Sequence, residues 1–402
     1  MSEATNSAQQ EGEEWGTGLV AFIQGSGPQS QLREDLARLK RSDAQVLAGG
    51  LSAAAQWCEV NLPPQVLLVD LDGEAWPLPA LESLMAMCGP QTRIIALGQG
   101  QDIGLYRALL QLGVTEYLVK PCTLDLLSAT LAKCDGQQSG PEYARTGRTV
   151  AVVGASGGVG TSTVAAGLAQ LMSGERHLPV ALVDFDRRHG DQLLLQGVSE
   201  SGGLSAVLES SQLDTRLLQR AMLQVDTRLH LLAQKPDLGP LSEPDADAVL
   251  HLGGSLCRMF NQVVWDLPGS FPNGALDVIC CADLRIIVTE LTVQDARNVK
   301  RIIQAIGDES EGQRLMLVHN QSHYAAAAPL TRAQFEALVG RPLDLVLPHA
   351  GVGLGQSLSL GALDLAASGP FRQAMRQLVD LACGQRLQPV KKNWLNGLLK
   401  RA

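Results

Sequence analysis

Residues 150 to 163 read Val150-Ala-Val-Val-Gly-Ala-Ser-Gly-Gly-Val-Gly-Thr-Ser-Thr163. An apolar run of β-branched residues ends at Gly154, a glycine-rich turn follows, and an amphipathic segment runs from Val164 to Met172. This order predicts a strand, a loop and a helix, with successive backbone N–H groups and a helix N-terminus directed at an anion. A glycine-rich turn alone is often only a structural turn, so its function depends on what accompanies it.

The stretch contains no lysine. In a phosphate-binding loop, a lysine normally contacts the β- and γ-phosphates, while a Ser or Thr hydroxyl reaches the metal. The glycines and hydroxyls are present and the cation is missing. The sequence therefore predicts nucleotide binding more firmly than nucleotide hydrolysis.

Two later apolar runs end in carboxylates, Leu182-Val-Asp-Phe-Asp186 and Val263-Val-Trp-Asp-Leu-Pro-Gly269. The carboxyl edge of a parallel sheet is where open α/β sheets bind ligands. An Asp that follows a hydrophobic strand holds Mg²⁺ through water in P-loop nucleotidases. An Asp at a strand end is often only a helix cap, but the ordered combination with the loop favours a nucleotide site.

The chain alternates short apolar runs with helical stretches, which predicts an α/β fold with two doubly wound parallel-sheet domains. We expect a flexible acidic tail over residues 1–16, a first domain over 17–134, a linker over 135–147, a second domain over 148–385 and a basic tail over 386–402. The expected strands of the first domain are 19–23, 66–69, 93–97 and 116–119, with helices at 31–40 and 103–112. Those of the second are 149–153, 180–184, 229–233, 262–266, 284–289, 314–318 and 343–347.

Composition and charge argue against several classes of protein. The formal net charge is -9, which argues against a DNA-coating surface because that needs a basic face. The eight cysteines form no Cys-x-x-Cys pair and the N-terminus is polar, so we expect reduced cytosolic thiols and no secretory signal. No apolar run approaches the roughly 20 residues of a spanning helix, so an integral membrane protein is not expected.

The order of the motifs resembles the ParA/MinD ATPases with a deviant Walker A loop. The motifs are Gly157-Gly-Val-Gly-x-Ser-Thr163, Val183-Asp-Phe-Asp186, Val264-Trp-Asp-Leu-Pro268, Ile287-Val-Thr-Glu-Leu291, Val318-His-Asn320 and Leu347-Pro348. The resemblance covers nearly all of residues 149–384 and implies a P-loop NTPase of the SIMIBI type that binds ATP and Mg²⁺.

The resemblance also implies roles for single residues. Asp186 would orient the attacking water, Asp266 would be the Walker B acid that holds Mg²⁺ through water, and Ser162 would supply the Mg²⁺ hydroxyl. Asn320 would read the adenine edge. The nucleotide would be held by Gly157, Gly158, Val159, Gly160, Thr161, Ser162 and Thr163 together with Asp266 and Asn320.

The departures from that family concern charge. Its signature lysine falls at Ser156 and its phosphate-clamping lysine at Thr161. Losing one preorganised donor at a developing charge typically costs on the order of 10²–10³ in rate. The signature lysine also reaches the partner's nucleotide across the family's dimer, so its loss weakens the case for strictly ATP-driven dimerisation. Arg187 or Arg188 could supply the missing positive charge, or both could be solvated loop residues.

The first domain resembles a response-regulator receiver of the flavodoxin type. The resemblance is carried by Val66-Leu-Leu-Val-Asp-Leu-Asp72, Arg93-Ile-Ile-Ala-Leu-Gly98 and Gly113-Val-Thr-Glu-Tyr-Leu-Val-Lys-Pro121. It puts Asp70 at the phosphoacceptor position and Lys120 in the Lys-Pro turn. The acidic pair that holds Mg²⁺ is replaced by residues 22–25, and the Thr or Ser after the fourth strand by Gly98. We expect a pseudo-receiver used for docking, with a phosphorylated switch as the alternative.

A receiver-like domain ahead of a deviant Walker ATPase is similar to the CpaE/TadZ proteins of tight-adherence (Flp) pilus systems. This resemblance implies a cytoplasmic, often polar factor that positions the pilus secretion machinery. Its expected partners are the secretion ATPase or inner-membrane platform proteins, and a second copy in a homodimer. The alternative is an active MinD- or ParA-like ATPase that cycles on membrane or DNA for positioning, division or partition. The formal net charge of -9 argues against nucleic acid as a partner.

The last residues are basic and amphipathic. Val390, Trp394, Leu395, Leu398 and Leu399 fall on one face of a helix, and residues past Gly384 carry five Lys or Arg and no acid. Such a helix suits an anionic membrane surface and would keep the protein peripheral to the inner membrane. It could instead dock on its own domain or on a partner.

Overall fold

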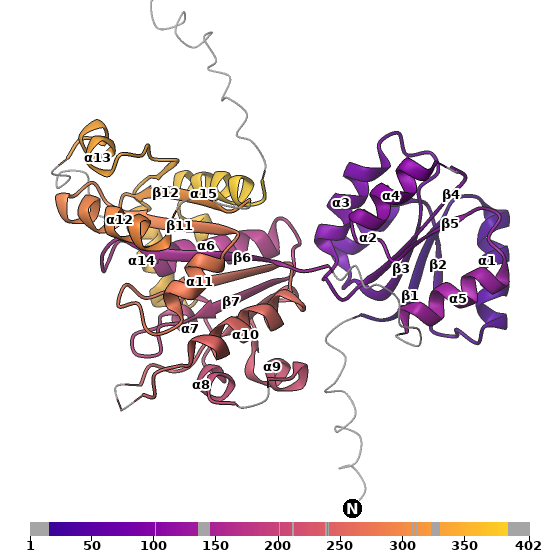
Figure 1. Ribbon diagram of the computed structural model, residues 1–402, viewed down its shortest axis with the longest axis horizontal. Coiled ribbons are helices and arrows are strands. Elements are labelled where there is room, and N and C mark those ends of the chain that lie inside the picture. The colour runs from indigo at the N-terminus through magenta and orange to yellow at the C-terminus, as the bar shows by residue number, and fades with distance from the viewer. Residues whose placement is uncertain are drawn as a thin grey trace, which may run out of the picture.

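The computed structural model describes residues 16–100, 102–135, 145–200, 202–210, 213–237, 239, 241–307, 309, 312–322 and 330–384. Almost all of the expected acidic tail, most of the expected linker and the basic tail with Trp394, Leu395, Leu398 and Leu399 lie outside these residues. The described chain forms two lobes, each built on its own sheet (Figure 1). Within the described ranges, no helix has both the length and the apolar character needed to cross a bilayer.

The first lobe contains a five-stranded parallel sheet in the order β2-β1-β3-β4-β5. Its strands are β1 (Gly16–Ile23), β2 (Gln45–Ala48), β3 (Pro64–Asp70), β4 (Arg93–Gly98) and β5 (Glu116–Val119). Its helices are α1 (Ser26–Arg38), α2 (Leu51–Val60), α3 (Pro77–Met87), α4 (Ile103–Gln111) and α5 (Leu124–Cys134). This strand order is the flavodoxin-type order, which has its topological switch point between β1 and β3.

Successive side chains of β1 point alternately into two hydrophobic cores, one on each face of the sheet. Val20 and Phe22 pack in the core formed with α2 and α3, whereas Leu19, Ala21 and Ile23 pack in the core formed with α1 and α5. Because both faces of the sheet are covered, its inner strands are continuous apolar runs.

The second lobe contains an eight-stranded sheet in the order β13-β12-β11-β6-β10-β7-β9-β8. Its strands are β6 (Arg148–Gly154), β7 (Val180–Asp184), β8 (Leu223–Gln224), β9 (Leu229–Leu232), β10 (Gln262–Leu267), β11 (Leu284–Thr289), β12 (Arg314–Asn320) and β13 (Leu345–Leu347). All neighbours pair in parallel except β8 and β9, which pair antiparallel.

Ten helices of the described chain belong to the second lobe and cover both faces of this sheet. They are α6 (Thr161–Gly174), α7 (Gln192–Leu195), α8 (Leu204–Leu208), α9 (Thr215–Ala221), α10 (Ala246–Cys257), α11 (Ala275–Cys281), α12 (Val293–Ile306), α13 (Arg332–Val339), α14 (Gly351–Leu360) and α15 (Gly369–Ala382). Val150 and Val152 of β6 pack with α6 and α15, whereas Ala151 and Val153 pack with α10, α11 and α12.

The predicted α/β class with two parallel sheets is confirmed. Every expected strand is present, with ends that differ by a few residues. Two strands, β2 and β8, were not predicted, and α1 begins and ends earlier than the expected helix over 31–40.

The strand order places the carboxyl ends of β6, β7 and β10 next to one another. β10 lies between β6 and β7, and Asp266 is in register with Val152 on one side and Asp184 on the other. The loop after β6 and the two carboxylate-bearing strand ends therefore share one carboxyl edge.

The lobes meet through side chains of the second lobe that bind carbonyls at the ends of α2 and α3. Arg228 is buried and donates from Nη1 to Met87 O at 3.0 Å and from Nη2 to Asn61 O at 2.9 Å. Asn261 donates from Nδ2 to Cys88 O at 3.0 Å. The last carbonyls of a helix lack intrahelical partners and carry partial negative charge, so these donors satisfy them.

Candidate nucleotide-binding site

The loop between β6 and α6 presents backbone to open space. Gly158 and Gly160 have φ of 82° and 87°, a left-handed conformation that favours glycine. A Cβ placed on Gly157 or Gly158 would meet no atom within 4 Å. The outer side of the loop is therefore free, and α6 begins at Thr161 directly behind it. This is the cradle that an anionic phosphate group requires.

The inner side of the loop is tightly packed. A Cβ on Gly160 would lie 2.4 Å from Asn320 Nδ2, so this glycine is required by close approach. Asn320 is buried and donates from Nδ2 to Val159 O at 2.8 Å. The residue that the resemblance assigns to the adenine edge thus lies against the loop, where its amide group holds the backbone.

The two positions that lack lysine carry hydroxyls directed into the protein. Ser156 Oγ donates to Asp295 Oδ1, 2.7 Å away in the first turn of α12. Asp295 is buried and also accepts the Glu290 N–H at 2.8 Å. Thr161 Oγ1 faces back into the turn, 2.3 Å from where a Cβ on Gly154 would stand. The Ser156 hydroxyl is therefore engaged by Asp295, and the Thr161 hydroxyl lies close to Gly154 at the start of the turn.

A second bond joins the loop to α12. Asn298 Nδ2 donates to Ala155 O at 2.9 Å, one turn after Asp295. The start of the loop is thus held by two side chains of one helix within the same chain.

Arg187 and Arg188 bind a different segment. Arg187 Nη2 donates to Ser242 O, and Arg188 Nη1 donates to Gly239 O at 3.3 Å. These contacts favour the interpretation of both arginines as loop residues over the hypothesis that they replace the missing lysines.

Asp184 and Asp266 form a buried carboxylate pair on neighbouring strands. Burial, and then the charge of Asp266, raise the pKa of Asp184 well above its usual range. Burial also raises the pKa of Asp266 to about 6, although hydrogen bonds from Gln192 and Ser162 oppose this shift. When both carboxyl groups ionise, their negative charges repel each other in a buried site. A bound cation would reduce this repulsion.

Asp186 lies at the rim of this pair. Its carboxyl is 30% exposed, and Oδ1 accepts the N–H groups of Arg188 at 3.0 Å and His189 at 2.9 Å. The predicted water-orienting role of Asp186 stays a prediction, and Asp184 is the carboxylate of this strand end that pairs with Asp266.

Gln192 belongs to the site and was missed by sequence reasoning. It is fully buried at the first position of α7, and Nε2 donates to Asp266 Oδ2 at 2.7 Å and to Ser162 O at 3.0 Å. Its backbone N–H donates to Asp184 Oδ2 at 3.0 Å. Its Oε1 atom has no hydrogen-bond partner among the described residues. No pattern in the sequence distinguishes this glutamine, because its contacts exist only in the folded chain.

The residues that the receiver resemblance singled out, Asp70 and Lys120, lie together at the carboxyl edge of the first sheet. Lys120 Nζ lies 2.5 Å from Asp70 Oδ2 and 2.8 Å from Asp72 Oδ2, with Asp70 fully buried. A Cβ on Gly98 would lie 2.6 Å from Tyr117 Oη, so the phenol fills the place expected for a Thr or Ser. The Gln24 N–H donates to Asp70 Oδ2 at 3.0 Å, in the segment after β1 that carries no acidic pair.

Neither a protein-family model nor a curated protein matches the chain. Among solved structures, a ParA family ATPase from Chlorobium tepidum TLS is 23% identical, with a TM-score of 0.52, and the match covers 60% of this chain and 98% of that one. The cell division ATPase MinD from Pyrococcus furiosus is 18% identical, with a TM-score of 0.50 and coverage of 59% and 99%. Over the part of the chain that these matches cover, the fold is that of the ParA and MinD ATPases.

A third match covers less of the chain at higher identity. The CpaE2 pilus assembly protein from Sinorhizobium meliloti 1021 is 32% identical, and the match covers 29% of this chain and 98% of that one, with a TM-score of 0.26.

The residues of this ParA/MinD fold fit a nucleotide with a divalent cation. Among the residues that the structure describes, no group of three or more His, Cys, Asp or Glu side chains could hold a metal by itself. The Ser162 hydroxyl hydrogen-bonds to Asp266, which puts a neutral oxygen beside a carboxylate. Mg²⁺ keeps several waters and is held by few protein ligands together with phosphates, so these two groups suit it.

Proposed function

We propose that this chain is a localisation and scaffold factor for assembly of the Flp, or tight-adherence, pilus secretion machinery. In this proposal it binds ATP and Mg²⁺ with slow or absent hydrolysis. The observation that carries the proposal is the state of the loop: its backbone cradle is open, while Ser156 and Thr161 stand where the family's lysines would be and direct their hydroxyls inward.

Different groups of the chain would contact the phosphates and the cation. The N–H groups of residues 157–163 and the N-terminus of α6 would hold the phosphates, and Ser162 and Asp266 would face the cation. Bound Mg²⁺ would neutralise phosphate charge. Asp186 would orient water if any turnover occurs. Without the lysines, the charge that develops during phosphoryl transfer lacks a preorganised donor, which lowers the rate by on the order of 10²–10³.

The first lobe fits a docking role. Lys120 pairs with the buried Asp70, so the phosphoacceptor position is occupied by an ion pair. We propose the pilus secretion ATPase or inner-membrane platform proteins as partners, a homodimer as the assembled form, and a polar, cytoplasmic location peripheral to the inner membrane. The 32% identity to a pilus assembly protein supports the pilus role. Membrane contact would come from the tail with Trp394, which lies outside the described residues.

The proposal is tested in the organism that encodes the chain. Deletion of its gene is expected to abolish Flp pili while leaving cell division and chromosome partition unchanged. A fluorescent fusion is expected at a pole, and an Asp266→Ala fusion, which weakens nucleotide binding, is expected to lose that position. Normal piliation of the deletion strain, or a division or partition defect in its place, would contradict the pilus assignment.

A further inference from the structure

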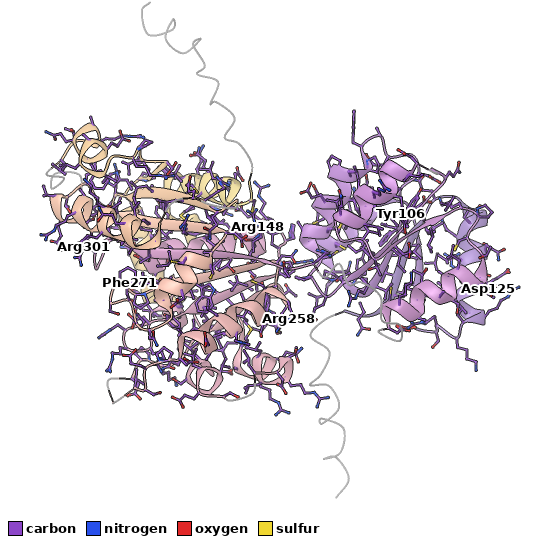
Figure 2. The ribbon with its side chains drawn as sticks, in the orientation of Figure 1. Tyr106, Asp125, Arg148, Arg258, Phe271 and Arg301 are labelled. Atoms are coloured by element: carbon purple, nitrogen blue, oxygen red, sulfur yellow. The ribbon has the colours of Figure 1, made fainter. Side chains whose placement is uncertain are left out.

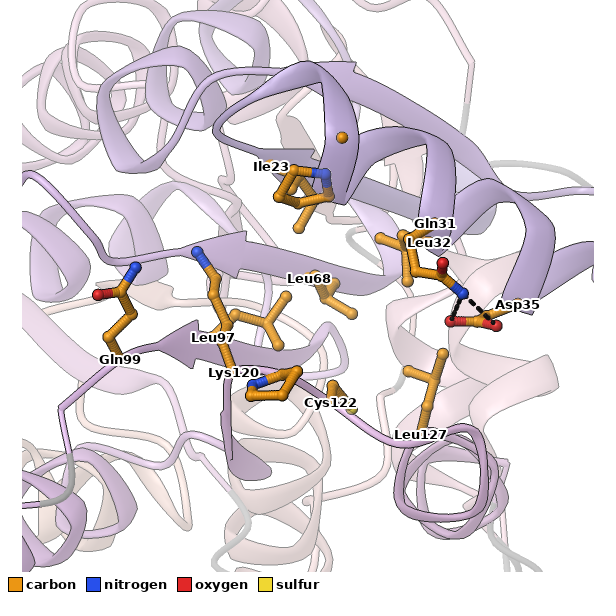
Figure 3. Close-up of a pocket in the computed structure, with 13 residues that line it drawn as sticks. Ile23, Gln31, Leu32, Asp35, Leu68, Leu97, Gln99, Lys120, Cys122 and Leu127 are labelled. Carbon is orange, nitrogen blue, oxygen red and sulfur yellow. Dashed lines mark hydrogen bonds between the residues drawn. The ribbon is translucent and has the colours of Figure 1, made fainter.

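The first lobe contains a cavity of about 450 Å³ between α1, α5 and the carboxyl edge of its sheet. Figure 3 shows the cavity with Ile23 of β1, Leu97 of β4 and Lys120, which follows β5, among its lining residues. The cavity lies away from the nucleotide site, which is in the other lobe. Its size is within the roughly 300–1,000 Å³ typical of small-molecule sites. It also lies at the sheet edge and near the β1/β3 switch point, where open α/β sheets bind ligands.

The wall of the cavity is mainly apolar. The apolar lining side chains are Ile23, Pro28, Leu32, Leu68, Leu97, Pro121 and Leu127. They come from both helices and from strands, so the wall is formed by elements that the core holds in place. Such a wall favours a ligand whose body is hydrocarbon.

One end of the cavity carries a carboxylate with little compensation. Asp35 is only 7% exposed, and its two oxygens accept hydrogen bonds from Gln31 Nε2 at 3.1 and 3.2 Å (Figure 3). The guanidinium of Arg38 lies 3.8 Å away on a side chain that is 63% exposed, so solvent screens most of its attraction. A neutral amide and one solvent-screened ion-pair partner leave Asp35 able to bind a further donor.

The negative charge of Asp35 affects other groups that line the cavity. Cys122 lines the same space, and burial together with the negative charge of Asp35 raises the pKa of its thiol. The wall therefore favours a positive ligand group over a negative one at this end.

The opposite end cannot balance an anionic ligand. Lys120 lines the cavity, but its ammonium is paired with Asp70 at 2.5 Å and Asp72 at 2.8 Å. A phosphate, nucleotide or fatty acid would compete with two carboxylates for this cation and would face Asp35 as well. Charge thus selects against anions at both ends.

We propose that this cavity is a binding site for a small apolar amine, with its hydrocarbon body against the leucines and its ammonium group at Asp35. The site is separate from the proposed nucleotide function and holds whether or not ATP is bound. It would make the receiver-like lobe a ligand-binding domain.

The charge preference is tested with hexylamine, hexanol and hexanoate on the full chain by calorimetric titration. A hydrogen bond to a charged group predicts that hexylamine binds about tenfold tighter than hexanol. Hexanoate is expected to bind more weakly than hexanol. Asp35→Asn should remove the preference for the amine and keep hexanol binding, which also shows that the cavity is still formed.

Asp125→Asn is the matched control, because Asp125 is an exposed carboxylate on α5 that Figure 2 places at the outer side of the lobe. It should leave all three affinities unchanged. Failure of all three probes to bind, or an amine preference that survives in Asp35→Asn, overturns the proposal.

The place of binding is tested by alkylation of cysteines followed by peptide mass spectrometry. Cys122 lines the cavity, whereas Cys280 and Cys281 are exposed on the other lobe. Saturating hexylamine should slow alkylation of Cys122 several-fold and leave the other two rates unchanged. An unchanged rate at Cys122 would show that the amine binds elsewhere, which overturns the assignment to this cavity.

Discussion

Short hydrogen bonds between side chains of different elements define the nucleotide site at the scale of residues. The family resemblance implied that Ser162 and Asp266 would lie beside the same cation, and the structure brings these two side chains together. It did not predict Asp295 or Gln192. An Asp in the first turn of a helix and a Gln beside a carboxylate are common, and only the packing of α12 and α7 gives them their contacts.

Gln192 is expected to link cation binding to nucleotide binding. Gln192→Leu removes the donor to Asp266 and the bond to Ser162 O while keeping the side chain's bulk. Losing a hydrogen bond to a charged group predicts that Mg²⁺-dependent ATP affinity falls about tenfold, because Asp266 is no longer held in place. ATP affinity in EDTA should change little. The measurement is calorimetric titration of ATP with Mg²⁺ and with EDTA.

Gln196→Leu provides the control. Gln196 is also buried, follows Gln192 by one helical turn, and accepts a hydrogen bond from Gln170 instead of donating to Asp266. It should leave the ratio of the two affinities unchanged. Equal losses of affinity with Mg²⁺ and with EDTA in Gln192→Leu would mean that Gln192 only supports the fold.

The sequence predicted elements well wherever both faces of a strand are buried. β6, β7 and β10 are continuous apolar runs because helices cover both sides of the sheet. β2 has only three consecutive apolar residues, one of them buried, and β8 has two residues in all, so both signals are short, and pairing with neighbours defines these strands. The start of α1 was missed because Ser26-Gly-Pro28 is a typical turn sequence.

At the end of β5, Lys120 is expected to stabilise the first lobe more than an ordinary surface lysine does. Lys120→Met leaves Asp70 buried without its counterion, since the remaining donors to Asp70 are backbone N–H groups. Breaking a buried pair from one side typically costs about 3–5 kcal/mol, and we expect about 3 because Lys120 is partly exposed. The measurement is urea unfolding of the full chain, followed by hydrogen exchange in β1 and β3.

Lys133→Met is the comparison variant in the same lobe. Lys133 pairs with Glu116 at 2.8 Å, but its side chain is 46% exposed, so its removal should cost less than about 1 kcal/mol. If both variants unfold at the same urea concentration as the wild type, Lys120 does not hold Asp70 in the way described.

For the whole molecule, the decisive feature is where the two lobes meet. Arg228 and Asn261 immediately precede β9 and β10, so they lie at the amino edge of the second sheet, opposite the nucleotide site. The carboxyl edge is thus left accessible beside the docked first lobe. The composition of the sequence indicated a boundary between the lobes. It did not predict the contacts of Arg228 and Asn261, because a single polar residue in a turn gives no recognisable sequence pattern.

Arg228 is expected to hold the lobes together. Arg228→Ala removes the donor from carbonyls at Cys58, Asn61 and Met87. Since a hydrogen bond involving a charged group contributes about 1.5–3 kcal/mol, the free energy of unfolding should fall by about 2–3 kcal/mol. Small-angle X-ray scattering should show a larger radius of gyration as the lobes separate.

Arg258 supplies the control for this variant. It lies near the same face, but its guanidinium bonds to Ser255 Oγ one turn back in its own helix. Arg258→Ala should leave the scattering profile unchanged. An unchanged profile for Arg228→Ala as well would mean that other contacts are sufficient to dock the lobes.

The most direct test of the central claim compares ATP binding and ATP turnover in one sample of purified protein, with Asp266→Ala as the binding-deficient control. We expect saturable, Mg²⁺-dependent ATP binding in the wild type that is strongly weakened in Asp266→Ala. We expect steady-state phosphate release at least about 10²-fold below that of a lysine-containing ATPase of this fold. Turnover in the range of such an ATPase, abolished by Asp266→Ala, would contradict the account.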